Sequence, residues 1–255
     1  MQKMFKMLRT AQSFKEKKSM DEIKNIIKDT NLKHIAIIMD GNRRWAKEKN
    51  LPSAMGHKKG VDSLKNILRA CNDFSIKYLT VYAFSTENWN RKKEEVEFLM
   101  NLVAVTLTNE LAEMHKENVQ IHFIGDLTKL SDKLQKILAN AVETTKNNTG
   151  VVLQIALNYG SRDEIVHAVQ KIVESGVKSD EIDEQLISEN LYTAGVPDPD
   201  ILIRTGGEQR ISNYLLWQIA YSEIIIRSEF WPDFDKNSLK DSILEFGKRQ
   251  RRYGK

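Results

Sequence analysis

The stretch His34-Ile-Ala-Ile-Ile-Met-Asp40-Gly-Asn-Arg-Arg-Trp45 decides the fold. It begins with a run of mostly apolar, β-forming residues that shows no alternation of polar and apolar side chains. Such a run is typical of a parallel strand that is covered on both faces, as in α/β proteins. The run stops abruptly at Asp40-Gly-Asn, and two arginines follow. The stretch therefore predicts a buried strand that ends in a polar turn.

The turn after this strand has the composition of a phosphate-binding site. Gly41 lets the backbone come close to a ligand, and Arg43 and Arg44 can neutralise an anion beside the first amides of the next helix. Asp40 would repel that anion unless a cation lies between them, and a magnesium-bridged diphosphate satisfies both groups. The alternative is an ordinary turn, because Asp-Gly and Gly-Asn pairs are common in turns. The functional interpretation requires other strands to end in the same way.

The overall composition is that of an ordinary globular protein. The chain has 255 residues, enough for one large α/β domain, and its net charge of +4 is too small to indicate nucleic-acid binding. Cys71 is the only cysteine, which excludes an internal disulfide and a cysteine-rich metal site and fits a reducing compartment. The sequence has neither an apolar run of about 18 residues nor the apolar core of a signal peptide. We therefore expect a cytoplasmic protein.

Strands and helices are predicted to alternate along the chain. We expect strands near residues 34–39, 78–84, 120–125, 151–157, 201–204 and 223–227. We expect helices near 43–50, 59–72, 92–117 and 131–147, a helix capped by Ser161, a Leu/Trp-rich helix after Arg210, a polar terminal helix and a basic turn at 56–60. This order predicts one α/β domain, residues 33–255, with a central, mostly parallel six-stranded sheet flanked by helices. Residues 1–32 are expected to form a basic helical lead-in.

Polar clusters follow several of the predicted strands. Because ligands of open α/β sheets bind beyond the carboxyl ends of the strands, these clusters should meet at one rim. The cations expected there are more than one diphosphate requires, which favours two anionic substrates that share a divalent ion through Asp40: Arg43, Arg44, His57, Arg91, Arg204 and Arg210. Loops are polar in any case, so each cluster taken singly is weak support. The chain has no P-loop, no dinucleotide-binding glycine motif and no Asp-Asp pair.

Several motifs, in a fixed order, carry a resemblance to a known family. They are Asp40-Gly-Asn-Arg-Arg-Trp45, Gly56-His57, Phe84-Ser-Thr-Glu-Asn-Trp-Asn-Arg91, Ile124-Gly-Asp126, Asn158-Tyr-Gly160, Ile203-Arg-Thr-Gly-Gly-Glu208 and Arg210-Ile-Ser-Asn-Tyr-Leu-Leu-Trp-Gln218. Together they resemble the cis-prenyltransferases, close to the bacterial undecaprenyl diphosphate synthases. The match runs from about residue 33 to Gly254. The resemblance implies condensation of isopentenyl diphosphate onto an allylic diphosphate, usually farnesyl diphosphate, with new double bonds in cis.

The resemblance also implies roles for individual residues. Asp40 would hold Mg²⁺ together with Glu223, and Asn88 would be catalytic. Isopentenyl diphosphate would contact Arg204, Arg210 and Ser212, and the allylic diphosphate would lie on the segment that begins at Gly41. The full set of implied substrate-binding residues is Gly41, Asn42, Arg43, Arg44, Trp45, Ser53, His57, Ser85, Thr86, Glu87, Trp89, Arg91, Arg204, Arg210, Ile211 and Ser212.

The chemistry of an allylic cation sets further expectations. A dry site with aromatic neighbours would stabilise the cation, and Trp45, Trp89 and Phe84 are candidates, although core packing explains Phe84 better. The family assigns proton acceptance to the position of Asn88. An amide is a poor base, so we expect Asn88 to orient the substrate while released pyrophosphate or water takes the proton.

Two positions depart from the family pattern. Ser53 stands where many members carry an arginine, a loss for which Lys58 or Lys59 could compensate, and Gln209 stands where some have a histidine near the metal. A tunnel for the prenyl chain is expected along the helix at 92–117. In the family, bulk at the positions of Ala83, Val119 and Val151 sets product length, and the small Ala83 favours a long product of the undecaprenyl class.

The resemblance implies a homodimer, and peripheral contact with a membrane is a further expectation. Apolar stretches at 215–218 and 224–226 could form a subunit interface, although core burial would explain them equally well. Two other functions compete with catalysis of prenyl transfer. One is a non-catalytic partner subunit of the same fold, and the other is a magnesium-dependent phosphotransferase or phosphatase. Nucleic-acid binding through the basic residues 248–252 is not favoured by the small net charge.

Overall fold

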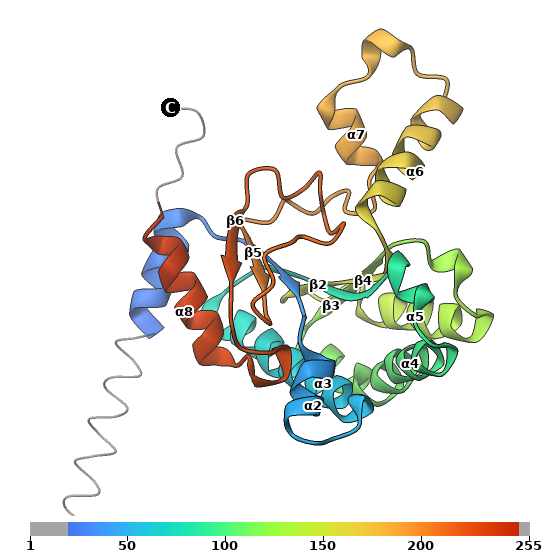
Figure 1. Cartoon of the computed structure of the whole chain (residues 1–255). Coiled ribbons are helices and arrows are strands. Elements are labelled where there is room, and N and C mark those ends of the chain that lie inside the picture. The colour runs from blue at the N-terminus through green and yellow to red at the C-terminus, as the bar shows by residue number, and fades with distance from the viewer. Residues whose placement is uncertain (1–19, 250–255) are drawn as a thin grey trace, which may run out of the picture.

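The computed structural model describes residues 20–249, which form one six-stranded sheet. All of its strand pairs are parallel, in the order β3-β4-β2-β1-β5-β6 (Figure 1). This arrangement confirms the predicted sheet, and every strand lies within a few residues of its predicted place. The strands are β1 (His34–Ile38), β2 (Tyr78–Ser85), β3 (Gln120–Ile124), β4 (Val152–Tyr159), β5 (Ile201–Arg204) and β6 (Glu223–Ile226).

The helices α2 to α7 occupy connections between strands, and α8 follows the last strand. The α-helices are α2 (Asn42–Glu48), α3 (Ser53–Phe74), α4 (Lys93–Lys116), α5 (Asp132–Thr145), α6 (Ser161–Glu174), α7 (Glu184–Asn190) and α8 (Lys236–Gly247). Short 3-10 turns are η1 (Thr86–Asn90), η2 (Leu127–Lys129), η3 (Ser179–Glu181) and η4 (Trp231–Asp233). Helices α8, α3, α4 and α5 pack in succession over one face of the sheet, whereas α6 and α7 form an arm that projects away from it (Figure 1).

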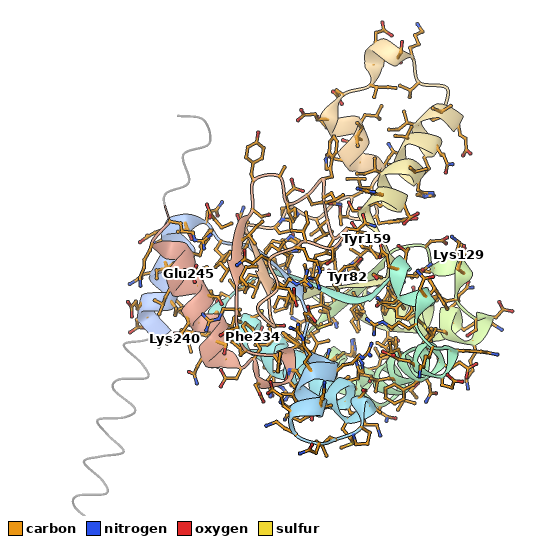
Figure 2. The ribbon with its side chains drawn as sticks, viewed as in Figure 1. Tyr82, Lys129, Tyr159, Phe234, Lys240 and Glu245 are labelled. Atoms are coloured by element: carbon orange, nitrogen blue, oxygen red, sulfur yellow. The ribbon has the colours of Figure 1, made fainter. Side chains whose placement is uncertain are left out.

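The opposite face of the sheet is covered by the irregular segment 211–219. Tyr214, Leu215 and Ile219 pack there against Ala36 and Ile38 of β1. The rings of Tyr82 and Tyr159 meet edge to face in this layer, with centroids 5.9 Å apart (Figure 2). A packed aromatic layer therefore lies directly beneath the end of β2.

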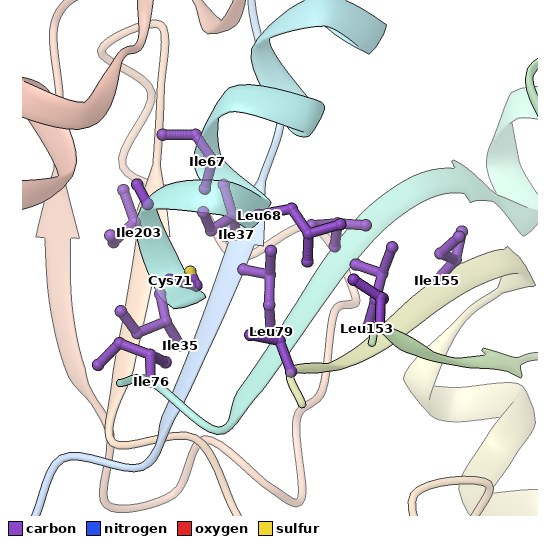
Figure 3. Close-up of a cluster of buried hydrophobic side chains, with 14 of the residues drawn as sticks. Ile35, Ile37, Ile67, Leu68, Cys71, Ile76, Leu79, Leu153, Ile155 and Ile203 are labelled. Atoms are coloured by element: carbon purple, nitrogen blue, oxygen red, sulfur yellow. The ribbon is translucent and has the colours of Figure 1, made fainter. Parts of the chain in front are cut away.

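The larger core cluster lies between the sheet and the helical layer. The alternate residues of β1, Ile35 and Ile37, point into it and meet Ile67 and Leu68 of α3 (Figure 3). Burial of β1 side chains on both faces explains why its sequence shows no polar alternation.

Two local predictions were wrong. The expected basic turn at 56–60 lies inside α3, because Gly56 and Gly60 serve helix packing: a Cβ on Gly56 would lie 1.9 Å from the Asn42 carbonyl oxygen. The expected Leu/Trp-rich helix after Arg210 is an irregular segment with left-handed φ angles at Ser212, Asn213 and Leu215.

Two further predictions can be compared with the structure. Gly160, not Ser161, caps α6, and the Ser161 hydroxyl accepts a hydrogen bond from the Leu216 amide instead. Of the stretches considered for a subunit interface, Leu215 is fully buried within this chain whereas Ile224 is 42% exposed. Core burial therefore explains the apolar Leu215, whereas Ile224 lies at the surface of the chain.

The predicted lead-in is described only from residue 20. Residues 20–30 are helical, and Ile23 and Ile27 are buried in the larger core cluster. Of the four basic residues at 248–252, Lys248 and Arg249 lie within the described range, and the other two lie outside it. Among residues 20–249, none of the helices is sufficiently long and apolar to cross a membrane.

Candidate active site

The carboxyl ends of β1 and β5 bring an acid and an arginine together. Ile38 pairs with Arg204 in the sheet, so Asp40 emerges directly beside the Arg204 side chain. Arg204 Nη2 donates a hydrogen bond of 2.8 Å to Asp40 Oδ2, and Arg44 Nη2 lies 3.2 Å from Oδ1. The two guanidinium groups therefore approach one carboxylate from different elements.

This pairing keeps Asp40 ionised. Burial raises the pKa of the carboxyl, but the hydrogen bond from Arg204 and the charges of Arg44 and Arg204 together outweigh burial, so the net pKa is lowered. Arg204 is only 4% exposed, and its Nη1 also donates to Ser212 Oγ at 2.9 Å and to the Arg210 carbonyl oxygen. Asp40 thus remains a charged oxygen donor at neutral pH.

The Thr-Gly-Gly segment after β5 lies against Arg44. Gly206 has a φ of +81°, and a Cβ there would lie 2.5 Å from Arg44 Nη2, so no larger residue fits without displacing the guanidinium. Arg44 Nη1 donates to the Gly206 carbonyl oxygen at 2.9 Å and lies 3.3 Å from Glu208 Oε1. Arg210 Nη1 contacts the other Glu208 oxygen at 2.5 Å. Glu208 therefore holds two of the predicted phosphate-binding arginines.

A first cavity, of about 790 Å³, lies over α2 and the start of α3. Its wall is mostly polar and cationic, as expected for a diphosphate. The predicted residues in this wall are Asp40, Gly41, Asn42, Arg43, Arg44, Ser53, His57 and Arg91. The lysine in the wall is Lys47, not Lys58 or Lys59, which were considered as replacements for the missing arginine at Ser53.

A second cavity, of about 670 Å³, shares Asp40, Asn42, His57 and Arg91 with the first. Its polar mouth adds Ser85, Glu87, Asn88, Arg204, Arg210 and Ser212. Its interior is apolar and lies between α3, α4 and the sheet, with walls that include Leu64, Ala83, Leu99, Val103, Leu107, Met114, Leu153 and Ile155. A charged mouth and an apolar interior thus form one continuous space.

His57 lies where the two cavities meet. Burial lowers its pKa to about 4, helped by the charges of Arg91 and Arg43 and opposed by that of Glu95. Its Nε2 is buried and has no hydrogen-bond partner among residues 20–249. A neutral imidazole with an unpaired nitrogen is available for a polar ligand at this position.

Asn88 enters the second cavity from η1. Its Oδ1 accepts the Ser85 amide at 3.3 Å, as part of a capping box in which the Ser85 side chain accepts the Asn88 amide. The side-chain oxygen accepts the Ser85 amide and the side chain lines the second cavity, so its NH₂ group can donate to a polar ligand there. This geometry suits the orienting role expected for Asn88 better than proton acceptance.

Four predicted substrate-binding residues lie outside both cavity walls as the structure describes them. Trp45 is buried and donates from Nε1 to Asp233 Oδ1 at 2.8 Å. Trp89 donates from Nε1 to Asn158, Thr86 donates to Asp163, and Ile211 packs on the tyrosine layer. These side chains make contacts within the protein, and neither cavity wall includes them. Phe84 is a core residue that also forms part of the cavity wall.

The structure does not place Glu223 beside Asp40 within one chain. Glu223 opens β6 and is level with Ile201, the first residue of β5, whereas Asp40 lies beyond the last residue of β1. Ile201 pairs with Ile35, so five residue positions separate these levels, on the order of 16 Å. Glu223 instead pairs with Arg249, at 2.8 Å. Its predicted metal role is therefore not supported by the geometry of a single chain.

Asp40 alone remains as the metal ligand suggested by this site. Among residues 20–249, no group of three or more His, Cys, Asp or Glu side chains could enclose a metal ion. Mg²⁺ is commonly held by one or two carboxylates together with substrate phosphates, so one ionised aspartate beside two cavities with arginines in their walls fits it.

Besides Lys47, sequence reasoning missed other residues at or beside the site, among them Tyr82, Asn213 and Glu95. Tyr82 and Asn213 line the second cavity, and Tyr82 stacks on Tyr214 with ring centroids 4.4 Å apart. Glu95 lies 3.0 Å from Arg91 and 3.6 Å from Arg43. The spacing of four residues between Arg91, which precedes the predicted helix, and Glu95 in its first turn was an available signal, as was the position of Asn213 after Ser212.

Comparison with known proteins supports one family. Residues 38–254 match the family model described as "Putative undecaprenyl diphosphate synthase". The chain belongs to this family. An isoprenyl transferase of Clostridium tetani is 51% identical over 87% of this chain and 89% of its own length. A ditrans,polycis-undecaprenyl-diphosphate synthase of Micrococcus luteus, named as specific for (2E,6E)-farnesyl diphosphate, is 50% identical over 87% of this chain and 91% of its own.

A solved structure shares the fold. Lavandulyl diphosphate synthase from Lavandula x intermedia, in complex with dimethylallyl diphosphate, superposes with a TM-score of 0.84 at 36% identity over 87% of this chain and 98% of that one. The predicted cis-prenyltransferase fold is confirmed. As a member of this family, the chain is a prenyl-transferring enzyme of the ditrans,polycis-polyprenyl diphosphate synthase type, acting on isoprenoid diphosphates.

Proposed function

We propose that this enzyme catalyses the magnesium-dependent, sequential cis condensation of isopentenyl diphosphate onto farnesyl diphosphate. The product would be a long-chain polyprenyl diphosphate of the undecaprenyl class, the precursor of the glycosyl carrier lipid of cell-wall synthesis. The observation that carries the proposal is the cavity of about 670 Å³ that joins a charged mouth at Asp40 and Arg204 to an apolar interior along α4. The name of the Micrococcus luteus relative supports the choice of primer.

The two cavities suit two diphosphates. The allylic diphosphate would occupy the cationic cavity over α2, against Arg43, Arg44 and His57, while its prenyl chain enters the apolar interior. Isopentenyl diphosphate would bind Arg204, Arg210 and Ser212 across the mouth. Asp40 lies between these groups, so it could hold Mg²⁺ jointly with a diphosphate. The bound ion would supply charge stabilisation to the departing pyrophosphate.

The remaining chemistry belongs to the side chains. Arg44 and Arg204 would stabilise negative charge as the carbon–oxygen bond of the allylic diphosphate breaks. The NH₂ group of Asn88 would orient isopentenyl diphosphate for attack on the allylic cation. Released pyrophosphate or water would then accept the proton, because no carboxamide is basic enough to do so at neutral pH. The apolar walls would keep other water away from the cation.

The direct test combines purified protein with farnesyl diphosphate, labelled isopentenyl diphosphate and Mg²⁺, and resolves the extracted products by chain length. We expect a magnesium-dependent ladder that ends in one long product, and no ladder after chelation of the metal. Incorporation that fails with farnesyl diphosphate and with shorter and longer primers would favour the non-catalytic partner subunit. Hydrolysis of a phosphate monoester without incorporation would favour the phosphatase.

Two further parts of the proposal concern association. We propose a homodimer, which sedimentation equilibrium would test, and peripheral contact with a membrane during product release. Co-flotation with vesicles that contain anionic lipid, before and after turnover, would test the membrane contact. A monomer at micromolar concentration would contradict the first part, and absence of co-flotation in both states would contradict the second.

A further inference from the structure

The turn η1 is held in place by side chains of neighbouring elements. Thr86 donates to Asp163 at 3.3 Å, Glu87 accepts from Asn213 at 3.0 Å, and Trp89 donates to Asn158 at 2.7 Å. All three partners belong to the end of β4, to α6 or to the segment 211–219. Asn88, which lies among the three tied residues, faces the second cavity. We call these three hydrogen bonds the ties of η1. They fix the turn from neighbouring elements, while Asn88 at its centre lines the second cavity.

Asn158 is fully oriented by its surroundings. Its Nδ2 donates to the Asp126 carbonyl oxygen at 2.7 Å, which leaves Oδ1 to accept the Trp89 indole N–H. The residue is 2% exposed and has a left-handed φ of +49°, which asparagine adopts more readily than other non-glycine residues. The Trp89 ring also packs edge-on against Phe84 in the cavity wall, with centroids 5.2 Å apart. Asn158 thus fixes an indole that in turn supports the wall.

Asn213 is oriented in the same way. Its Oδ1 accepts the Arg162 amide at 3.0 Å, which leaves Nδ2 to donate to the Glu87 carboxylate. Its φ is +59°, and it directly follows Ser212, which accepts from Arg204. One side chain therefore joins η1 to the loop that carries the predicted contacts of isopentenyl diphosphate.

Gly160 shows how tightly these ties are packed. A Cβ on this residue would lie 2.6 Å from Thr86 Oγ1, 2.7 Å from Asp163 Oδ2 and 2.8 Å from Asn213 Nδ2. The φ of Gly160 is −152°, an extended conformation that any residue can adopt. The absence of a side chain is therefore required by the neighbouring contacts and not by the backbone.

We propose that Asn158 and Asn213 are positioning residues for condensation: they hold η1 so that Asn88 and Arg91 face both substrates. The catalytic part of this inference rests on the proposed function. A displacement of about 1 Å at a reacting group can lower a rate by about 100-fold, so the contacts that fix such a turn are as important as the groups it presents.

The sharpest test exchanges donor and acceptor in the hydrogen bond between Asn213 and Glu87. Asn213→Asp places a carboxylate against Glu87 while it still accepts the Arg162 amide, so the turn should be released. Adding Glu87→Gln restores a hydrogen bond of opposite polarity, because the glutamine amide donates to the new carboxylate. We expect Asn213→Asp to lower kcat/KM for isopentenyl diphosphate by about 10- to 100-fold. The double variant should recover to the level of Glu87→Gln alone.

Hydrogen exchange of residues 85–92 gives a readout that does not need turnover. Protection should fall in Asn213→Asp, Asn158→Ala and Gly160→Ala, and return in Asn213→Asp/Glu87→Gln. Asn118→Ala is the matched control, since Asn118 also has a left-handed φ (+60°) and bonds Thr149 through both side-chain atoms, but lies between α4 and β3. It should leave both protection and turnover unchanged.

The possible outcomes separate the two levels of the proposal. Unchanged protection in Asn158→Ala and Asn213→Asp, or failure of the double variant to restore it, would overturn the positioning role. Lost protection with unchanged kinetics, or equal losses in Asn118→Ala, would show that the ties serve stability alone. If the unmodified protein condenses no substrate, the proposed function fails, and hydrogen exchange still decides whether the asparagines hold the turn.

Discussion

The carboxylate of Asp40 is bound by two guanidinium groups and still borders both cavities. Arg204 is buried, so its charge needs a counter-ion that stays in place, and Asp40 provides it. The same carboxylate is the predicted metal ligand, and it borders both cavities. Asp40 therefore has two roles: it neutralises the buried charge of Arg204, and it is the proposed ligand of Mg²⁺.

The substitution Asp40→Asn separates the contact with Arg204 from the binding of Mg²⁺. The amide keeps an oxygen that can accept from Arg204, but it lacks the charge that would attract Mg²⁺. We expect the product ladder to fall at least about 100-fold, and the unfolding midpoint to fall less than in Asp40→Ala, because the amide oxygen still accepts from Arg204 although it carries no charge. Asp40→Ala should abolish condensation and also lower the midpoint, because it leaves the Arg204 guanidinium without its carboxylate. Full turnover in either variant would refute the metal assignment.

Residue-level prediction succeeded where the chemistry depends on strand ends. Asp40 and Arg204 could be placed together from sequence, because adjacent parallel strands carry their following turns to one rim. Glu223 could not be placed at that rim, since the sequence already puts it at the beginning of its strand. Trp45 and Trp89 were assigned to the site from the family resemblance and from their aromatic rings, but a sequence does not show that their indole N–H groups bond Asp233 and Asn158.

Among the elements, β2 and α4 define the apolar space. Ala83 of β2 lies in the cavity wall, whereas Val119 and Val151 are buried in the core cluster outside that wall as described. Met114 and Leu153 lie in the wall near the amino ends of the strands, far from Asp40 along the sheet. Of the three positions expected to set product length, Ala83 is the one with direct access to the space.

Ala83→Leu should shorten the products. The larger side chain would fill part of the interior, so chain growth should stop several condensations earlier while the first condensation continues. Product ladders of the variant and the unmodified protein measure this directly. Ala104→Leu is the matched control, because Ala104 packs on the core from α4 but is not part of the cavity wall. An unaltered ladder in Ala83→Leu would remove this residue from the tunnel.

A polar row crosses the sheet at its centre. His34 of β1 contacts Thr80 of β2 at 2.7 Å through Nε2 and the Pro197 carbonyl oxygen at 2.6 Å through Nδ1, while Thr80 lies 2.9 Å from Gln154 of β4. Burial lowers the pKa of His34 to about 4, and the Pro197 carbonyl and the charge of Asp200 only partly oppose it. The folded protein thus keeps this histidine neutral.

This pKa predicts a loss of stability in mild acid. The unfolded state binds the proton near pH 6.5 and the folded state near pH 4, so the stabilisation is present above pH 6.5 and disappears as the pH falls toward 4. We expect His34 to account for about 2 kcal/mol of the decrease in unfolding free energy between pH 7.5 and 5. Urea titrations at the two pH values would show it. The decrease should be smaller in His34→Gln, and an identical decrease would exclude His34 as its source.

Element-level prediction was accurate for strands and long helices, since apolar periodicity records which face is buried. It failed for the segment 56–60, where glycines that permit a close approach of α3 to Asn42 look identical in sequence to glycines that make a turn. It also failed for 211–219, because an apolar run can be buried as an irregular layer when left-handed residues such as Ser212 and Asn213 break the helix.

At the scale of the whole molecule, the reaction rate of the Cys71 thiol measures how often the folded protein unfolds. The thiol is fully buried in the larger core cluster, and burial raises its pKa to about 12. Since the thiolate is the reactive form, we expect reaction with a thiol reagent to be at least about 1,000-fold slower in buffer than in denaturing urea. Isopentenyl diphosphate and Mg²⁺ should slow it further if both bind the folded state. Rapid reaction in buffer would contradict the packing around α3.

The order of strands has a consequence for how the protein is made. Because β1 lies between β2 and β5, one side of the first strand stays without its partner until residues 201–204 have been synthesised. Asp40 meets its arginine across 164 positions of sequence. A nascent chain must therefore protect an open parallel edge for most of translation, which is the kind of intermediate that chaperones bind. A chain that terminates before residue 204 would lack both the completed sheet and the charge pair at its rim, so premature products would be inert instead of partly active.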